Sequence, residues 1–298
     1  MRGVFIDANG SLADIFEHQT RAGDPPIRVN RNADITSGEI PALLGGAEIV
    51  VIDHTELPTD IARACTGLKH VVFLGTGARS YMNPEELAEL GITVHTIKGY
   101  GDTAVAECAI ALMWSAARGI AAMDRGMRAG NWLREDGMQL TGKTLGLIGY
   151  GGIAAEVARI ARGSGMRVIA WNRTLKKEDG VEFVALDKLL ADSHVVSLHL
   201  LLNDETRGFL TAQHIAAMKP GVIFINTARA ALVDETAMIS ALKSGHIRHA
   251  GLDVFNIEPL PADHELTKLP NVTLSAHSAF RTPEANENLI HAAWEHCR

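Results

Sequence analysis

From Thr144 to Ala154 the chain reads Thr-Leu-Gly-Leu-Ile-Gly-Tyr-Gly-Gly-Ile-Ala, and the architecture can be worked out from this stretch. Its first five residues are mostly apolar, which is typical of a strand buried on both faces of a parallel sheet. The glycines that follow match the pattern G-x-G-x-x-A, and a helical composition continues after them. We therefore expect a strand, a tight turn and a helix in direct succession.

The residues of this turn have separate physical roles in binding a dinucleotide. Gly149 permits the tight turn, Gly151 lets the backbone approach a pyrophosphate, and Ala154 is small enough for the helix to pack on the strand. The first N–H groups of the helix are free to bind phosphate. A glycine-rich turn without a ligand is the alternative, and the flanking strand and helix favour the dinucleotide site over it. The predicted cofactor contacts here are Gly149, Tyr150, Gly151, Gly152 and Ile153.

Short runs rich in Val and Ile recur along the chain and are separated by helical segments. They form two series, at residues 3–6, 48–52, 70–74 and 92–95, and at residues 144–149, 167–171, 195–200, 222–226, 249–254 and 272–275. Regular alternation of strands and helices predicts parallel sheets covered on both faces. The six runs of the second series suit a nucleotide-binding sheet.

The length of 298 residues, 47% of them hydrophobic, is enough for two domains. We predict an α/β fold of two doubly wound parallel-sheet domains, a Rossmann coenzyme domain and a flavodoxin-like substrate domain. A single long helix is expected over residues 103–128, after a hinge-like cluster of Gly and Asp at residues 99–102. The predicted substrate domain comprises residues 1–99 and 283–298, and the coenzyme domain comprises residues 100–282.

Composition excludes several classes of partner. The net charge is −7 and no dense basic run is present, which argues against nucleic acid and anionic membranes. Cys65, Cys108 and Cys297 are far apart, so neither a disulfide framework nor a metal site is expected. The longest apolar run, residues 108–117, is shorter than the roughly 18 residues of a membrane span, and Asp7 interrupts the N-terminus where a signal peptide is apolar. We expect a cytoplasmic protein that binds small molecules.

The strand at residues 167–171 ends at Asn172, where a site specific for NAD has an acid that binds the ribose hydroxyls. Arg173 instead supplies a guanidinium suited to a 2′-phosphate, with Thr174, Lys176 and Lys177 close by. The sequence therefore predicts a preference for NADP(H), with NAD(H) as a possible second cofactor. A solvated basic loop is the alternative, because two acids follow the two lysines.

Three side chains suited to keto-acid chemistry follow strands of the second series. Arg229, Glu258 and His277 each come after a predicted strand, and ligands of open α/β sheets bind beyond the carboxyl ends of the strands. Reduction of a 2-keto acid by hydride needs a cation for the carboxylate and carbonyl, and an acid to protonate the developing alkoxide. A carboxylate on the other imidazole nitrogen would orient the ring and raise its pKa.

These residues belong to a series of motifs that resembles the D-isomer-specific 2-hydroxyacid dehydrogenase family over nearly the full chain. The matching segments are residues 105–107, 140–144, 226–229, 251–255, 258–261, 269–272 and 276–277. The resemblance implies that Arg229 binds the substrate, that His277 carries the proton and that Glu258 pairs with His277. It also implies a homodimer formed through the long helix and the arm at Trp132 and Leu133.

Further contacts complete the expected site. The resemblance implies that the turn Gly75-Thr76-Gly77 offers backbone N–H groups to the substrate carboxylate. His54 is a further candidate substrate contact, because it follows a strand of the first series. Departures from the family pattern are Asp102, where Asn is frequent, Ala230, where Gly is usual, and Phe280, which is expected to narrow or cap the substrate pocket. The remaining expected cofactor contacts are Thr103, Asn172, Arg173, Thr174, Thr227, Ala228, Asp253 and His277.

The function predicted from the sequence is reduction of small 2-keto acids, such as glyoxylate or hydroxypyruvate, to D-2-hydroxy acids with NADPH. An NAD-dependent 2-hydroxyacid dehydrogenase of a biosynthetic route is the first alternative, and Asn172 in place of the ribose acid disfavours it. A binding protein that senses dinucleotides without catalysis is the second. Turnover of a keto acid distinguishes an enzyme from such a sensor.

Overall fold

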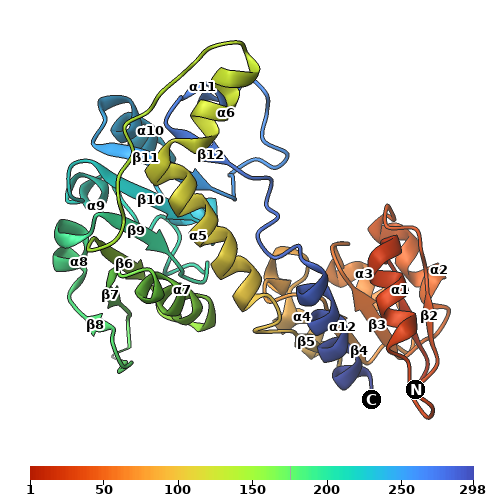
Figure 1. Ribbon diagram of the computed structural model, residues 1–298. Coiled ribbons are helices and arrows are strands. Elements are labelled where there is room, and N and C mark those ends of the chain that lie inside the picture. Colours follow the sequence, from red (N-terminus) through yellow and green to blue (C-terminus); the bar gives the residue numbers. More distant parts are fainter. Residues whose placement is uncertain (175) are drawn as a thin grey trace. The chain divides into compact units, whose positions relative to one another are not determined.

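The computed structural model describes residues 1–174 and 176–298, and it divides into two compact units (Figure 1). The first unit comprises Met1–Gly101 and Arg281–Arg298, and the second comprises Asp102–Phe280. The predicted boundaries were residues 99 and 282. Each unit contains one sheet whose strands are all parallel, so the predicted fold class is confirmed.

The sheet of the first unit has the strand order β2-β1-β3-β4-β5. This is the flavodoxin-like order. The second strand is added on one side of β1, and the later strands are added on its other side. The edge strand β2 was not predicted, because it has only three residues and none of them is buried. The strands are β1 Gly3–Phe5, β2 Ile27–Val29, β3 Ile49–Ile52, β4 His70–Phe73 and β5 Thr93–Thr96.

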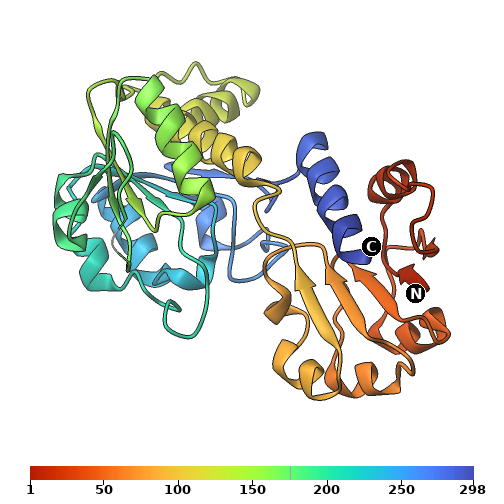
Figure 2. The ribbon, with the colours of Figure 1, turned by 90° about the horizontal axis from the view of Figure 1, so that it is seen from below.

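Helices cover both faces of this sheet (Figure 2). On one face lie α1 (Gly10–His18) and α12 (Pro283–Cys297). On the other lie α2 (Ile40–Leu44), α3 (Thr59–Ala64) and α4 (Pro84–Glu89). The rings of Phe16 and Trp294 stack with centroids 4.4 Å apart, and the Trp294 indole donates a hydrogen bond to the Phe16 carbonyl. The C-terminal helix is therefore part of the core of the first unit.

The sheet of the second unit has seven strands in the order β12-β11-β10-β9-β6-β7-β8. This is the Rossmann order with one further strand at the edge. Six strands were predicted, and the one missed is β8, which has two residues and no periodicity to detect. The strands are β6 Thr144–Ile148, β7 Arg167–Trp171, β8 Glu182–Phe183, β9 Val195–Leu198, β10 Val222–Asn226, β11 Ile247–Leu252 and β12 Val272–Leu274.

Two apolar cores lie on opposite faces of this sheet. One contains α5 (Asp102–Arg118) and α7 (Gly152–Gly163). The other contains α8 (Leu186–Asp192), α9 (Ala212–Ala216), α10 (Glu235–Ser244) and α11 (Glu265–Lys268). This two-sided burial explains why the strands read as continuous apolar runs.

The prediction of one long helix over residues 103–128 is wrong. The helix breaks at Gly119, whose left-handed backbone (φ 63°) separates α5 from α6 (Ile120–Arg128). Glycine adopts this conformation without the steric cost that other residues have. No single described helix is long and apolar enough to cross a membrane; α5 and α6 meet that criterion only jointly, across a 67° bend, and α5 is part of the buried core.

Candidate active site

The glycine turn has the geometry expected of a phosphate-binding turn. Strand β6 ends at Ile148 and α7 begins at Gly152, so the expected succession of strand, turn and helix is confirmed. Gly149 has φ +88°, and a Cβ there would lie 2.6 Å from the His199 carbonyl oxygen. A Cβ on Gly151 would meet no atom within 4 Å, so the backbone just before α7 is open at that residue. Free N–H groups and the helix dipole make this position suited to an anion.

The loop after β7 is tied to this turn. The amide oxygen of Asn172 accepts a hydrogen bond from the Tyr150 N–H at 3.1 Å, and its amide nitrogen donates to the Thr174 carbonyl. Lys176 donates to the Tyr150 carbonyl at 2.7 Å. Arg173 is exposed and forms an ion pair with Glu205, in the loop after β9. Arg173 therefore follows a residue that is bonded to the glycine turn, and the guanidinium predicted to bind a 2′-phosphate has an acidic neighbour.

The loop after β10 carries an unpartnered polar atom. Asn226 bridges the loop, because its amide oxygen accepts from the Ala228 N–H and its amide nitrogen donates to the Arg229 carbonyl. Between them, the hydroxyl of Thr227 is buried and has no hydrogen-bond partner among the described residues. Buried polar groups are nearly always satisfied, so this hydroxyl fits a bound group such as the expected cofactor. The residues of this edge thus fit a dinucleotide.

Asp253 fixes the loop that carries His277. Its side chain is fully buried, and its two oxygens accept hydrogen bonds from the Ser275 hydroxyl and from the backbone N–H groups of Ser278 (3.1 Å) and Ala279 (2.9 Å). Its carbonyl also accepts from the His277 N–H at 2.8 Å. The carboxylate faces this loop, and its expected contact with the nicotinamide stays a prediction.

The structure brings His277 and Glu258 into direct contact. Nδ1 of His277 lies 2.6 Å from Oε2 of Glu258, and Oε1 of Glu258 accepts from the Phe255 N–H at 2.8 Å. His277 has φ +48°, the one positive value among the described residues other than glycine. Within the described chain its Nε2 has no hydrogen-bond partner. Glu258 therefore orients the ring and leaves Nε2 available for a ligand.

Arg229 follows β10, whereas Glu258 and His277 follow the neighbouring strands β11 and β12. Its guanidinium is exposed and donates to the Ala228 carbonyl at 2.7 Å. Among the described residues it has no carboxylate partner, and it forms no hydrogen bond with His277 or Glu258. At this edge of the sheet the structure thus shows a guanidinium without a carboxylate partner among the described residues. No described hydrogen bond links Arg229 to His277 or Glu258.

In the first unit, the turn after β4 also has free donors. Gly75 donates to the Phe73 carbonyl, whereas the N–H groups of Thr76 and Gly77 have no acceptor in the described parts of the chain. Successive free N–H groups form an anion-binding concavity. The turn therefore keeps the property expected for binding a carboxylate.

His54 is held within the first unit. Its Nδ1 lies 3.2 Å from Asp53, its Nε2 lies 3.0 Å from the Ala33 carbonyl, and the buried carboxylate of Asp7 accepts the N–H groups of the loop over residues 53–55. The hydrogen bond that Asp53 accepts from His54, with the charge of Asp7, raises the pKa of His54 to about 9. Both ring nitrogens are engaged, so a substrate contact of His54 stays a prediction.

We expect His54 to make stability depend on pH. Because its pKa is raised in the folded protein, its contribution is complete below about pH 6.5, the value in an unfolded chain, and is lost as the pH rises through about 9. Replacing His54 with Asn should flatten this part of the profile. Urea unfolding of both proteins at several pH values between 6 and 9.5 measures it; parallel profiles would contradict the prediction. The side chain is nearly half exposed, so the effect is small.

Several other residues complete the comparison with the sequence. Thr103 is exposed in the first turn of α5, and Phe280 is half-buried at the end of the second unit. The roles of Asn226 and Asp7 were not predicted from the sequence. An Asn that bonds the N–H two residues later is a recognised turn pattern, which could have identified Asn226. The described residues contain no group of three or more His, Cys, Asp or Glu placed to hold a metal ion.

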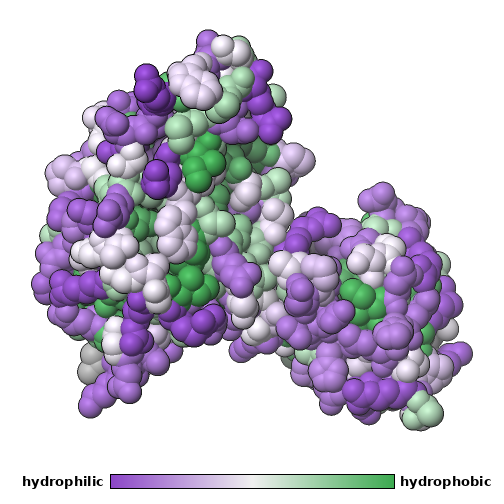
Figure 3. Space-filling model, viewed as in Figure 1, coloured by the Kyte–Doolittle hydropathy of each residue, from purple (hydrophilic) through white to green (hydrophobic). Residues whose placement is uncertain are grey.

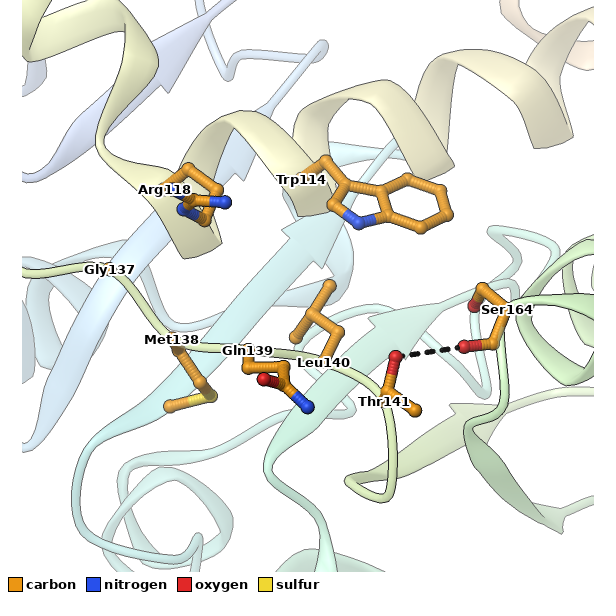
Figure 4. A pocket seen from close by; sticks show the side chains of 8 residues that line it. All are labelled: Trp114, Arg118, Gly137, Met138, Gln139, Leu140, Thr141 and Ser164. Carbon is orange, nitrogen blue, oxygen red and sulfur yellow. Dashed lines mark hydrogen bonds between the residues drawn. The ribbon is translucent and has the colours of Figure 1, made fainter.

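A cavity of about 390 Å³ lies away from these residues (Figure 4). Trp114 and Arg118 project from α5 toward residues 137–141, and the Thr141 hydroxyl donates to the Ser164 carbonyl at 3.2 Å. Residues 137–141 lead directly into β6, so the cavity lies at the amino end of that strand. The candidate site lies at the carboxyl ends of the strands. It contains none of the expected site residues.

Known proteins resemble this chain over most of its length. The sequence model described as "D-isomer specific 2-hydroxyacid dehydrogenase, NAD binding domain" matches residues 110–279. Hydroxypyruvate reductase of Thermotoga maritima is 38% identical over 81% of this chain and 80% of its own. Glyoxylate reductase of Korarchaeum cryptofilum is 40% identical over 69% of this chain and 65% of its own. The solved structure of an acyclic imino acid reductase in complex with NADPH and D-Arg has a TM-score of 0.85 and 29% identity, covering 98% of this chain and 94% of that one.

Proposed function

Because the chain belongs to the D-isomer specific 2-hydroxyacid dehydrogenase family, we propose that it reduces small 2-keto acids to D-2-hydroxy acids with NADPH. Names of relatives support glyoxylate and hydroxypyruvate as first substrates. The observation that carries the proposal is the imidazole of His277, which is paired with Glu258 through Nδ1 and has Nε2 unpartnered within the described residues. That arrangement is the one a proton donor to a carbonyl oxygen needs.

In the proposed mechanism the residues act on two adjacent groups of the substrate, its carboxylate and its carbonyl. Arg229 binds the carboxylate and polarises the carbonyl. NADPH, when bound, supplies the hydride that adds to the carbonyl carbon. His277 gives its Nε2 proton to the carbonyl oxygen, so that C=O becomes CH–OH, and Glu258 stabilises the imidazolium before transfer. Proton uptake from solvent then restores His277.

The test of this proposal is the loss of NADPH absorbance with glyoxylate, hydroxypyruvate, pyruvate and phenylpyruvate, each repeated with NADH. We expect turnover with at least one of the small keto acids and a higher kcat/KM with NADPH. A chain that binds NADPH and reduces none of the acids would instead be a dinucleotide sensor. A clear preference for NADH would leave the reaction class intact and overturn the choice of cofactor.

Arg173 is the residue that we propose to select NADPH. It is exposed, it follows the strand after the glycine turn, and Asn172 stands where an acid would bind the ribose of NAD. We expect Arg173→Ala to weaken NADPH binding about tenfold, the loss of roughly one charge-assisted hydrogen bond to phosphate, and to leave NADH binding nearly unchanged. Dissociation constants for both cofactors measure this, with Arg207→Ala, also exposed, as the control. Equal weakening of both would contradict the assignment.

We also propose that the protein is a homodimer formed through the second unit. Large apolar side chains are exposed on α6 and the following arm, at Ile120 (52%), Met127 (56%), Trp132 (77%) and Leu133 (40%). Figure 3 shows apolar patches on the face formed by α5 and α6. Such clusters are typical of protein interfaces. Sedimentation should give about twice the mass of 32.0 kDa, and Trp132→Asp should shift the protein toward the monomer; a wild-type monomer at micromolar concentration would exclude the dimer.

A further inference from the structure

Two helices of the second unit begin at the same place. Helices α5 and α7 lie side by side (Figure 1), with Asp102 as the first residue of α5 and Gly152 as the first residue of α7. A Cβ placed on Gly152 would lie 1.8 Å from Oδ2 of Asp102 and 2.7 Å from its Cγ. The Asp102 carboxylate therefore occupies the space beside Gly152 that a side chain at that position would fill.

The charge of this carboxylate is not compensated by a partner. Asp102 is half-buried, and within the described residues its side chain has no hydrogen bond and no ion pair. Glu156, one turn further along α7, is a second negative charge nearby, and it is itself paired with Arg159 at 2.8 Å. Burial and the charge of Glu156 raise the pKa of Asp102. The Asp102 carboxylate is therefore stabilised by the amino ends of α5 and α7, where the helix dipoles are positive.

The amino end of α7 is also where the proposed function locates the pyrophosphate of the cofactor. A Cβ on Gly151 would meet no atom, so its backbone is open to phosphate, and Thr103, next to Asp102, is an expected cofactor contact. A carboxylate and a pyrophosphate would share this end of the helix. Like charges a few ångströms apart repel each other substantially where the surroundings are partly dry.

We infer that Asp102 sets the affinity for the dinucleotide: its carboxylate competes with the pyrophosphate for the amino end of α7 and keeps the cofactor weakly held and rapidly exchanged. This inference rests on the proposed function, because it requires a dinucleotide at the glycine turn. It adds a determinant of affinity that is separate from Arg173. The pyrophosphate is common to NADPH and NADH, whereas Arg173 is proposed to bind the 2′-phosphate of NADPH alone.

Asp102→Asn tests the inference, because the amide has the size of the carboxylate and lacks its charge. We expect the dissociation constants of NADPH and NADH each to fall about five- to tenfold, with their ratio unchanged. Slower release of the cofactor should account for most of the change. Titration calorimetry and stopped-flow fluorescence measure both quantities without turnover. Damage to the fold would weaken cofactor binding, so tighter binding by this variant cannot be caused by misfolding.

The matched control is Asp192→Asn, which removes one negative charge from the end of α8, where Asp192 pairs with Lys188. It should leave both dissociation constants unchanged. Unchanged or weaker binding by Asp102→Asn, while the wild type binds, would overturn the inference and leave the proposed function standing. Absence of dinucleotide binding by the wild type would overturn the proposed function, and the inference with it. Asp102→Ser serves as the second neutral variant if the Asn variant does not fold.

Discussion

Replacing His277 with alanine should lower kcat for the keto acid by roughly 10² to 10⁴, the loss expected when a positioned general acid is removed. The expectation rests on the 2.6 Å contact between Nδ1 and Glu258, which leaves Nε2 without a partner among the described residues. NADPH binding should fall far less than kcat, because His277 is only one of the expected cofactor contacts and the phosphate-binding turn belongs to a different loop. Steady-state kinetics together with a dissociation constant for NADPH separate the two effects.

Two further variants sharpen this test. Glu258→Gln keeps a hydrogen-bonding partner for His277 and removes the charge that stabilises the imidazolium, so a smaller loss of kcat is expected. The double variant should be little worse than His277→Ala alone, because residues that act as a unit are not additive. His18→Ala, at the exposed end of α1, is the control for loss of a histidine. Near wild-type turnover by His277→Ala would remove it from the mechanism.

The second large effect is expected at Asp253. Its two oxygens accept three hydrogen bonds from residues 275–279, and an amide offers a single acceptor oxygen. Asp253→Asn therefore leaves buried N–H or O–H groups without an acceptor, at a cost of about 2–4 kcal/mol in the free energy of unfolding. Urea unfolding measures this loss.

Asp253→Asn should also lower kcat, because the same loop holds His277 in its left-handed backbone conformation. Ser275→Ala removes one of the three donors and leaves the carboxylate, so it should have a much smaller effect on both quantities. If Asp253→Asn lost stability and kept full kcat at a temperature where it is folded, the loop would not depend on Asp253 for the position of His277.

The sequence was most informative where a feature depends on local pattern. Apolar runs identified ten of the strands, and the glycine turn identified the start of α7, because both signals lie within a few consecutive residues. The break at Gly119 was missed because an isolated glycine inside a helical composition is often tolerated. The strands β2 and β8 were missed because three and two residues are too few to show a period.

In the candidate site, too, some contacts could be predicted from the sequence and others could not. The pairing of His277 with Glu258 was anticipated from the order of the motifs, and the structure confirms that contact. The inward direction of Asp253 and the position of Asp102 against Gly152 were not anticipated. Both depend on which way a side chain turns between elements distant in sequence, and spacing along the chain does not determine that direction.

The stacking of Trp294 on Phe16 has a consequence for the order in which the protein can be made. Every strand of the first sheet leaves the ribosome before α12 does. One face of that sheet, including Phe5, Val51 and Val72, is therefore covered by α1 alone until α12 has been translated. The second unit contains all of its own segments earlier and can be folded first. The unit whose strands are synthesised first is thus the last to complete its core.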